Sequence, residues 1–227
     1  MIRLFMGQAK SGKTYKVYEE MKQHIENGKN NETILIVPEQ FTLEAEKQFI
    51  SHSRMNGILG VEIISFKRLM HRIFMEVGSI DQSIITEMGK MMLLRKVFLS
   101  SEEVLQLYKN AYDKPGFLLK FHELIQELKQ NMIVPDDLDR IYKSIEVESL
   151  LKLKIKDLKT IFEGYENEKG DLFFDDEDYY NLLLEVMPET ELLKNASVWV
   201  DGFDSFTVQE YEILKRIAQD SKNLTLT

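Results

Sequence analysis

The sequence predicts an α/β protein in which a parallel β-sheet is interrupted by a long helical segment. Three observations predict this class. Short apolar runs alternate with amphipathic stretches up to about residue 83, strand-like runs are absent between residues 84 and 170, and the alternation returns near residue 171. Such alternation is typical of a parallel sheet covered by helices. The sequence therefore divides into a core, 1–83 and 171–227, and an inserted all-helical subdomain, 84–170.

In the first core segment, three apolar runs of strand length are each followed by a stretch with helical periodicity. The expected strands cover residues 2–6, 33–37 and 61–65, and the composition of the first two indicates that they are buried. The expected helices cover about residues 14–27, 43–51 and 66–77, and Gly28 is a natural end for the first.

In the helical segment, two sets of apolar side chains recur every three or four residues. One set is Phe117, Phe121, Leu124, Leu128 and Met132, and the other is Leu151, Ile155, Leu158, Phe162 and Tyr165. Because the second set covers only about two heptads, packing within a helical subdomain is favoured over a coiled coil.

After residue 171, the acidic run 175–178 opens a predicted helix that reaches residue 186. We expect these acids to cap the helix and to be solvated. A strand at 197–200, a helix at 208–218 and a strand beginning at 223 follow. Because the last run is apolar and no turn or cap follows it, we expect the chain to be the N-terminal part of a longer polypeptide.

Composition excludes several classes of protein. The chain is 44% hydrophobic and carries 29 − 38 = −9 formal charges, so it is not a disordered acidic tail. It has neither an apolar run of about 18 residues nor a signal-peptide pattern, so we expect a cytoplasmic protein without a membrane anchor. The absence of cysteine excludes a disulfide, a thiolate zinc site and an iron–sulfur cluster in these residues. Residues 171–227 alone carry 4 − 13 = −9, so a partner surface is expected there first.

A phosphate-binding motif follows the first predicted strand. Residues 7–14 match the Walker A pattern G-x-x-x-x-G-K-[ST] and are Gly7, Gln8, Ala9, Lys10, Ser11, Gly12, Lys13 and Thr14. The glycines let backbone N–H groups approach the phosphates, and the next helix directs its N-terminus at the same charge. We expect Lys13 to reach the β- and γ-phosphates of ATP and the Thr14 hydroxyl to bind Mg²⁺.

A second acid is needed to complete the Mg²⁺ shell. Asp201, which directly follows the strand at 197–200, is the candidate Walker B residue, and a simple turn residue is the alternative. In hydrolysing enzymes a glutamate usually follows this aspartate, but here the next residue is Gly202. ATP binding is therefore better supported than ATP hydrolysis. The four histidines lie far apart in sequence, so no metal other than nucleotide-bound Mg²⁺ is expected.

Five segments occur in an order that resembles one protein family. They are GQAKSGKT, VPEQFT (37–42), ISFKRL (64–69), DLFFDDEDYYNLLL (171–184) and VDGFDSFTVQE (200–210). Together they resemble the N-terminal region of AddB, the family of B subunits of the ATP-dependent helicase/deoxyribonuclease, which is a relative of the UvrD-like superfamily I helicases. The resemblance covers essentially all 227 residues.

The resemblance implies a RecA-like P-loop NTPase core within a longer polypeptide. In that family, the B subunit works with the helicase/nuclease A subunit in a heterodimer that processes double-strand DNA ends for recombinational repair. The family's exonuclease domain and its iron–sulfur cluster would lie beyond residue 227. Gly202 fits a family in which this helicase core has weak or no motor activity of its own.

The resemblance also implies contacts to single-stranded DNA. The candidates are Pro38, Glu39 and Gln40 in one helicase motif, and Ser65 and Phe66 in the next. Lys67 and Arg68 add either phosphate contacts or a solvated helix face, and both interpretations stay open. Two other functions also stay open, namely a small P-loop kinase and a nucleotide-binding scaffold that docks on a partner.

Overall fold

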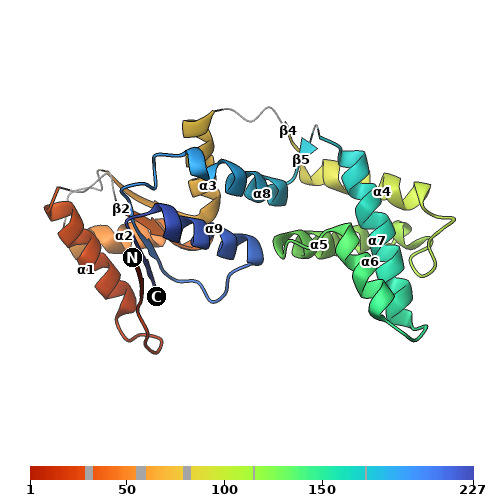
Figure 1. The fold of residues 1–227 in the computed structure, drawn as a ribbon, viewed down its shortest axis with the longest axis horizontal. Helices are drawn as coiled ribbons and strands as arrows, with labels where there is room; N and C mark the ends of the chain where they lie inside the picture. Colours follow the sequence, from red (N-terminus) through yellow and green to blue (C-terminus); the bar gives the residue numbers. More distant parts are fainter. Residues whose placement is uncertain (29–32, 55–59, 79–82, 115, 172) are drawn as a thin grey trace. The chain divides into compact units, whose positions relative to one another are not determined.

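The computed structural model describes residues 1–28, 33–54, 60–78, 83–114, 116–171 and 173–227. The chain divides into two compact units (Figure 1). Unit 1 comprises Met1–Ile80 and Tyr180–Thr227, and unit 2 comprises Asp81–Tyr179. The expected boundaries lie at 83/84 and 170/171, so the return to unit 1 comes 179 − 170 = 9 residues later than expected.

Unit 1 contains a five-stranded sheet in which every neighbouring pair of strands is parallel. The order across the sheet is β1 (Ile2–Leu4), β7 (Asn223–Leu226), β6 (Ser197–Val200), β2 (Thr33–Ile36) and β3 (Val61–Ile64). The prediction of an α/β protein with a parallel sheet is therefore confirmed. Because the carboxyl ends of parallel strands meet at one edge, the loops that follow β1, β2, β3 and β6 open on the same side of the sheet.

One face of the sheet packs against α1 (Lys13–Glu26) and α2 (Thr42–Ser53), which contribute apolar side chains to a shared core cluster. Leu35 of β2 and Trp199 of β6 belong to that cluster and are register partners. Trp199 is paired in turn with Thr225 of β7, whose hydroxyl accepts a hydrogen bond from Arg3 of β1 at 2.7 Å. The Arg3 guanidinium also binds Glu20 of α1 at 2.7 Å. The side chains of Leu35, Trp199, Thr225 and Arg3 therefore lie on the face of the sheet that α1 covers.

The remaining helices of unit 1 are positioned by local sequence signals. These helices are α3 (Phe66–Val77), α8 (Asp176–Val186), which continues from unit 2, and α9 (Val208–Asp220). The Ser65 hydroxyl caps α3 by accepting from the Arg68 N–H. Thr207 and Glu210 form a reciprocal capping box at the start of α9. Two short 3₁₀ helices, Glu39–Phe41 and Met187–Glu189, complete the unit.

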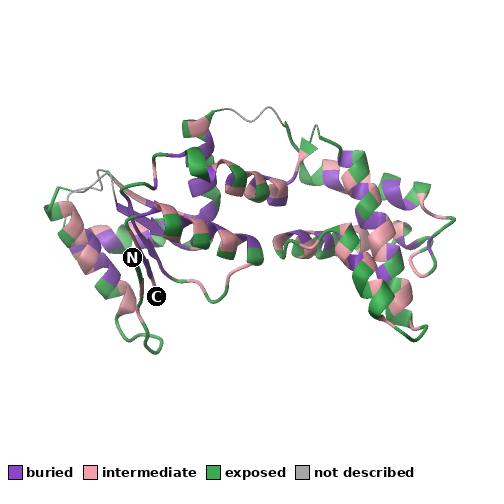
Figure 2. Ribbon diagram, in the orientation of Figure 1, coloured by how far each residue is buried: buried purple, intermediate pink, exposed green. Residues whose placement is uncertain are grey.

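The position of β1 differs from the prediction of a buried strand. β1 is the edge strand, and Ile2 and Leu4 are 64% and 61% exposed, whereas all residues of β2 and β6 are buried. Figure 2 shows the inner strands in purple and the N-terminal strand largely in green. The prediction of burial was wrong because apolar composition identifies a strand without giving its place in the sheet.

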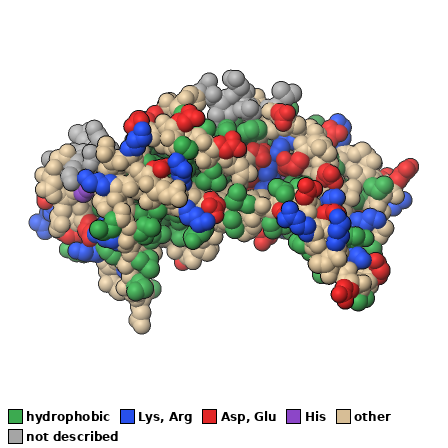
Figure 3. All heavy atoms as spheres, viewed as in Figure 1, with side chains coloured by type: hydrophobic (Ala, Val, Ile, Leu, Met, Phe, Trp, Pro, Cys, Tyr) green, Lys and Arg blue, Asp and Glu red, His purple; other side chains and the backbone are tan. Residues whose placement is uncertain are grey.

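Unit 2 is built mainly from helices. They are α4 (Glu87–Ser100), α5 (Phe117–Gln130), α6 (Pro135–Ser144) and α7 (Leu150–Lys169), with a 3₁₀ turn at Ala111–Asp113. Their core includes Phe121, Ile155, Phe162 and Tyr165 from the two predicted apolar sets, whereas Leu151 is 57% exposed. Acidic and basic side chains are interspersed over this unit (Figure 3).

Two short strands at the ends of unit 2 were not predicted. β4 (Ser83–Ile84) and β5 (Phe173–Phe174) pair in parallel, and the Ile85 N–H donates to the Phe174 carbonyl at 2.9 Å. Each strand has only two residues, which is too short to produce a periodic signal in the sequence.

The second unit boundary is displaced by a buried ionic cluster. Asp175 and Asp178 cap the start of α8 reciprocally, as each accepts the other's backbone N–H at 3.0 Å. Their carboxylates also bind Lys129 of α5 at 2.5 and 2.7 Å, and both contact Lys169 of α7. Asp175 and Glu177 are only 2% and 3% exposed, so the expectation that this acidic run is solvated is wrong for these two residues. The part of α8 that precedes Tyr180 therefore belongs to unit 2.

Candidate functional site

The Walker A segment forms the loop between β1 and α1. A Cβ atom at Gly7 would lie 2.5 Å from Ser11 Oγ, so any larger residue at this close turn would force the Ser11 side chain to move. Gly12 precedes α1 with a φ of +88°, in the left-handed region that favours glycine. Within the described part of the chain, no side chain caps the N-terminus of α1. An uncapped helix N-terminus is a favourable site for an anion, because its first N–H groups lack intrahelical acceptors.

Lys13 folds back over this loop. Its ammonium donates to the carbonyl oxygens of Gly7 at 3.0 Å and of Gln8 at 3.2 Å. These contacts place the positive charge inside the curve of the loop, next to the α1 N-terminus. A phosphate group entering the loop would offer the ammonium a charged acceptor in place of neutral carbonyls.

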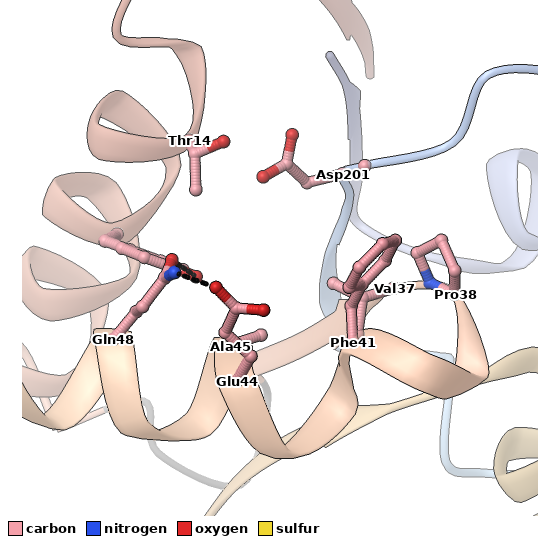
Figure 4. Close-up of a pocket in the computed structure, with 10 residues that line it drawn as sticks. Thr14, Val37, Pro38, Phe41, Glu44, Ala45, Gln48 and Asp201 are labelled. Carbon is pink, nitrogen blue, oxygen red and sulfur yellow. Dashed lines mark hydrogen bonds between the residues drawn. The ribbon is translucent and has the colours of Figure 1, made fainter. Parts of the chain in front are cut away.

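Thr14 and Asp201 line one cavity of about 200 Å³ at the carboxyl edge of the sheet. Figure 4 shows the two side chains directed toward each other from α1 and from the end of β6, with α2 forming the opposite wall. Asp201 is 8% exposed, and its backbone N–H donates to the Ile36 carbonyl at 3.0 Å. The Thr227 hydroxyl donates a hydrogen bond to its carboxylate. The structure thus brings together the two side chains that were assigned to Mg²⁺.

Three polar side chains at this cavity were not identified from the sequence. They are Tyr18, Glu44 and Gln48, and the Gln48 amide donates to the Glu44 carboxylate at 2.8 Å (Figure 4). Burial, followed by the charges of Asp201 and Glu44, raises the pKa of Tyr18 to about 12. The phenol therefore stays protonated between two carboxylates. No short motif marks these residues, because only the packing of α1 against α2 brings them to the site.

Gly202 occupies the position where a hydrolysing enzyme places a glutamate. Its φ is +82°, and an added Cβ would lie 3.5 Å from Pro38 Cδ. The space is adequate, but a residue with a Cβ is strained at this φ. Gly202 itself lines the cavity beside Asp201, in a backbone conformation that favours glycine.

The residues predicted to contact DNA gather at a second hollow, after β2 and β3. Its cavity volume is about 300 Å³, and its lining includes Pro38, Glu39, Gln40, Ser65, Phe66 and Lys67. Arg68 lies beside it, with its guanidinium 4.0 Å from the Glu39 carboxylate. The structure therefore places all seven candidates together, although they come from two separate motifs.

Some of these side chains are already engaged. The Ser65 hydroxyl donates to the Glu39 carboxylate, and Ser65 is 3% exposed. Phe66 is 2% exposed and packs against Phe203, with ring centroids 5.4 Å apart. Phe203 also lines the hollow, and sequence reasoning did not select it as a site residue. Lys67 is the basic side chain within the lining.

The described residues support neither a membrane-spanning segment nor a metal site made by protein side chains alone. None of their helices combines the length and the apolar character that a bilayer crossing needs. Within the same residues, no cluster of three or more His, Cys, Asp or Glu side chains could hold a metal ion. The pair formed by Thr14 and Asp201 would hold Mg²⁺ only together with further oxygen ligands, such as those of a nucleotide phosphate.

Comparison with known proteins places this geometry in context. A family model described as "ADDB, N-terminal" matches residues 4–227. Proteins named as the B subunit of the ATP-dependent helicase/deoxyribonuclease are 39% identical in Alkaliphilus metalliredigens and 40% identical in Alkaliphilus oremlandii, over 226 residues each. The protein of that name from Thermoanaerobacter sp. is 33% identical over 226 residues. Each alignment covers 100% of this chain but 20% of the relative, so the chain spans about a fifth of their length.

Proposed function

The chain belongs to the family of AddB N-terminal domains, and we propose on this basis that it is the ATP-binding, helicase-like part of a DNA-end-processing B subunit. The observation that carries the proposal is the shared cavity of Thr14 and Asp201 beside the glycine-dependent loop at residues 7–14. A RecA-like P-loop core accounts for both features.

Within this proposal, each residue of the site has a role. The backbone N–H groups of the loop and of the α1 N-terminus bind the phosphates, and Lys13 exchanges its carbonyl contacts for a phosphate oxygen. The Thr14 hydroxyl and the Asp201 carboxylate hold Mg²⁺ directly or through water. When bound, the nucleotide supplies a phosphoanhydride bond that can drive conformational change. Thr227 orients the Asp201 carboxylate, and the Tyr18 hydroxyl donates to Gln48, whose amide in turn binds Glu44.

The same geometry supports weak or absent motor activity. Orientation of an attacking water needs a carboxylate next to the γ-phosphate, and Gly202 supplies none. Glu44 is the other carboxylate in the cavity lining, and it is held by Gln48 on α2. We expect the site to act mainly as a binding site, with slow turnover.

The wider role belongs to the same proposal and is supported by the names of the relatives, which are B subunits of an ATP-dependent helicase/deoxyribonuclease, and by the family resemblance of the sequence. We propose that the full-length protein pairs with the helicase/nuclease A subunit, forming a heterodimer, and acts as an exonuclease in DNA repair and recombination. Single-stranded DNA would contact the hollow after β2 and β3 through Pro38, Glu39, Gln40, Ser65, Phe66, Lys67 and Arg68. The iron–sulfur cluster of the family would lie outside these residues, which contain no cysteine.

The nucleotide site is tested by titrating the chain with Mg²⁺-ATP in a calorimeter. Lys13→Ala is expected to lower the affinity by at least about tenfold, because it removes a charge-assisted contact to phosphate. Lys22→Ala is the matched control, since Lys22 lies on the same helix and pairs only loosely with Glu26, at 4.0 Å. Equal ATP affinity for the Lys13 variant and the parent chain would contradict the proposal.

The DNA contacts are tested by binding a fluorescent single-stranded oligonucleotide at several salt concentrations. A plot of log affinity against log salt concentration has a negative slope. Each phosphate contact that Lys67→Ala or Arg68→Ala removes should make this slope less steep by about 0.7. Lys215→Ala, which removes an exposed charge on α9, should leave that slope unchanged. A slope unaffected by the first two variants would assign Lys67 and Arg68 to a solvated helix face.

A further inference from the structure

A second carboxylate enters the cavity of Thr14 and Asp201 from the opposite wall. Glu44 lies in the first turn of α2 and lines the same cavity of about 200 Å³. Figure 4 shows its side chain rising from α2 into the hollow that Thr14 and Asp201 face. Among the described residues that line this cavity, Glu44 and Asp201 are the two acids. Because the Asp201 carboxylate is assigned to Mg²⁺, Glu44 is the acid that is available for another task.

Two hydrogen bonds in series hold the Glu44 carboxylate. The Gln48 amide, one helical turn further along α2, donates to it at 2.8 Å. The Tyr18 hydroxyl of α1 donates to the side-chain oxygen of Gln48 at 3.4 Å, which leaves the NH₂ group of that amide directed at Glu44. This series ties the carboxylate to the helix that also carries Thr14. Glu44 is at the same time exposed, so water can reach the carboxylate.

The order of the strands brings the start of α2 to the end of β6. β2, which leads into α2, is the neighbour of β6 in the sheet, and their last residues, Ile36 and Val200, are register partners. The two strands therefore end level, and a side chain at the start of α2 reaches the space beyond Asp201 from the side. Gly202, by contrast, has a φ of +82°, at which a glutamate would be strained. A carboxylate for this space thus comes more readily from α2 than from the residue after Asp201.

We propose that Glu44 orients the water that attacks the γ-phosphate of ATP, in place of the glutamate that is absent after Asp201, and that it supplies the slow turnover of this site. The proposal rests on the proposed function, because it needs ATP bound at residues 7–14.

The reaction is an in-line displacement by water. The water oxygen forms a bond to the γ-phosphorus, the bond from that phosphorus to the bridging oxygen breaks, and its electron pair leaves with ADP. The proton of the water passes to the Glu44 carboxylate and from there to solvent, which the exposed side chain can reach. The products are ADP, inorganic phosphate and one proton.

The test measures binding and turnover separately for three proteins, namely the parent chain, Glu44→Gln and Glu46→Gln. Glu44→Gln keeps the size of the side chain and an oxygen that can accept from Gln48, but it removes the negative charge. Glu46 also lies on α2 and does not belong to the cavity lining, so its variant is the matched control. Calorimetry gives the affinities for Mg²⁺-ATP, for Mg²⁺-ADP and for Mg²⁺-ADP with fluoroaluminate, which mimics the transition state of phosphoryl transfer. Release of phosphate from saturating ATP gives the turnover.

We expect Glu44→Gln to lower turnover by at least about tenfold, because it removes the group that accepts the proton. The gain in affinity that fluoroaluminate gives over ADP alone should fall by a similar factor, since it reports interactions made in the transition state. The affinity for ATP should change by less than about twofold, and Glu46→Gln should match the parent chain in every measurement.

Equal phosphate release by Glu44→Gln and the parent chain would overturn the proposal. A parent chain that binds ATP without releasing phosphate would also overturn it, while leaving the nucleotide site intact. A parent chain that binds no ATP would overturn the proposal together with the proposed function, and the calorimetric titration distinguishes this case from the other two.

Discussion

The hydroxyl of Thr227, at the end of β7, donates a hydrogen bond to the carboxylate of Asp201, at the end of β6. β7 lies between β1 and β6, so Thr227 stands between the strand that leads into the loop at residues 7–14 and the strand that precedes Asp201. A partner of this kind fixes the orientation of a metal-binding carboxylate.

We therefore expect Thr227→Val to weaken Mg²⁺-dependent ATP binding by about tenfold, since loss of such a partner typically costs that much affinity or more. Thr227→Ser retains the hydroxyl and should bind nearly as tightly as the parent chain. Calorimetric titration with Mg²⁺-ATP compares the three proteins. Indistinguishable affinities for the Val and Ser variants would show that the hydrogen bond has no part in binding.

Gly202→Ala should destabilise unit 1 by about 1 kcal/mol, because a side chain at a φ of +82° is strained. The chain has one tryptophan, Trp199, which is buried in β6 of this unit, so its fluorescence during urea unfolding reports unit 1. Ser205→Ala, at an exposed position in the same loop, is the control. Because of the same strain, we expect that Gly202→Glu does not restore ATP hydrolysis, although it places a glutamate after Asp201. Rapid ATP turnover by that variant would refute this expectation.

Lys129→Met should destabilise unit 2 by about 3–5 kcal/mol, because it leaves buried Asp175 short of one of its counter-charges. Burial disfavours the charged ammonium, but Asp175, Glu166 and Asp178 outweigh it and hold the pKa of Lys129 above its usual range. Lys120→Met on the same helix removes a lysine whose side chain is 77% exposed, and should cost less than about 1 kcal/mol. Hydrogen exchange of the α5 and α7 amides measures both effects. Similar losses for the two variants would argue against the buried cluster.

The stability of unit 2 should fall as the pH drops below about 6.5. Burial, followed by the Lys90 charge, lowers the pKa of His122 below its usual 6.5. The unfolded chain therefore takes up this proton first, and stability falls between about pH 6.5 and the lower folded pKa by at most about 1.4 kcal/mol per pH unit. His122→Gln should flatten this part of the profile in urea unfolding followed by circular dichroism. His71→Gln, at an exposed position, should leave it unchanged.

Local patterns were sufficient to predict most of the elements and the class of the fold. α3 spans the predicted residues 66–77, because Ser65 supplies a cap and the apolar residues follow a clear helical period. The exposure of Ile2 and Leu4 could not be predicted in this way, since strand order depends on long-range pairing. The buried pairing of Lys129 with Asp175 was missed for a similar reason, because 46 residues separate the two partners.

The candidate site was predictable only where chemistry imposes a short motif. Lys13 and Thr14 follow from the spacing of the phosphate loop, and Asp201 follows from its place after an apolar strand. Tyr18, Glu44 and Thr227 carry no such signal, since each comes to the site through the packing of separate elements. The roles of all these residues in binding nucleotide or DNA remain predictions.

The pairing of β4 with β5 bears on how unit 2 can be removed from the chain or exchanged. Ser83 lies opposite Phe173 and Ile84 opposite Phe174, so segments close to the two ends of unit 2 lie on adjacent strands, about 5 Å apart. An insertion whose two ends meet in this way can be excised and its host rejoined by a few residues, with little cost in loop closure. We therefore expect that the helical unit, together with the part of α8 that precedes Tyr180, can be exchanged without rethreading the sheet.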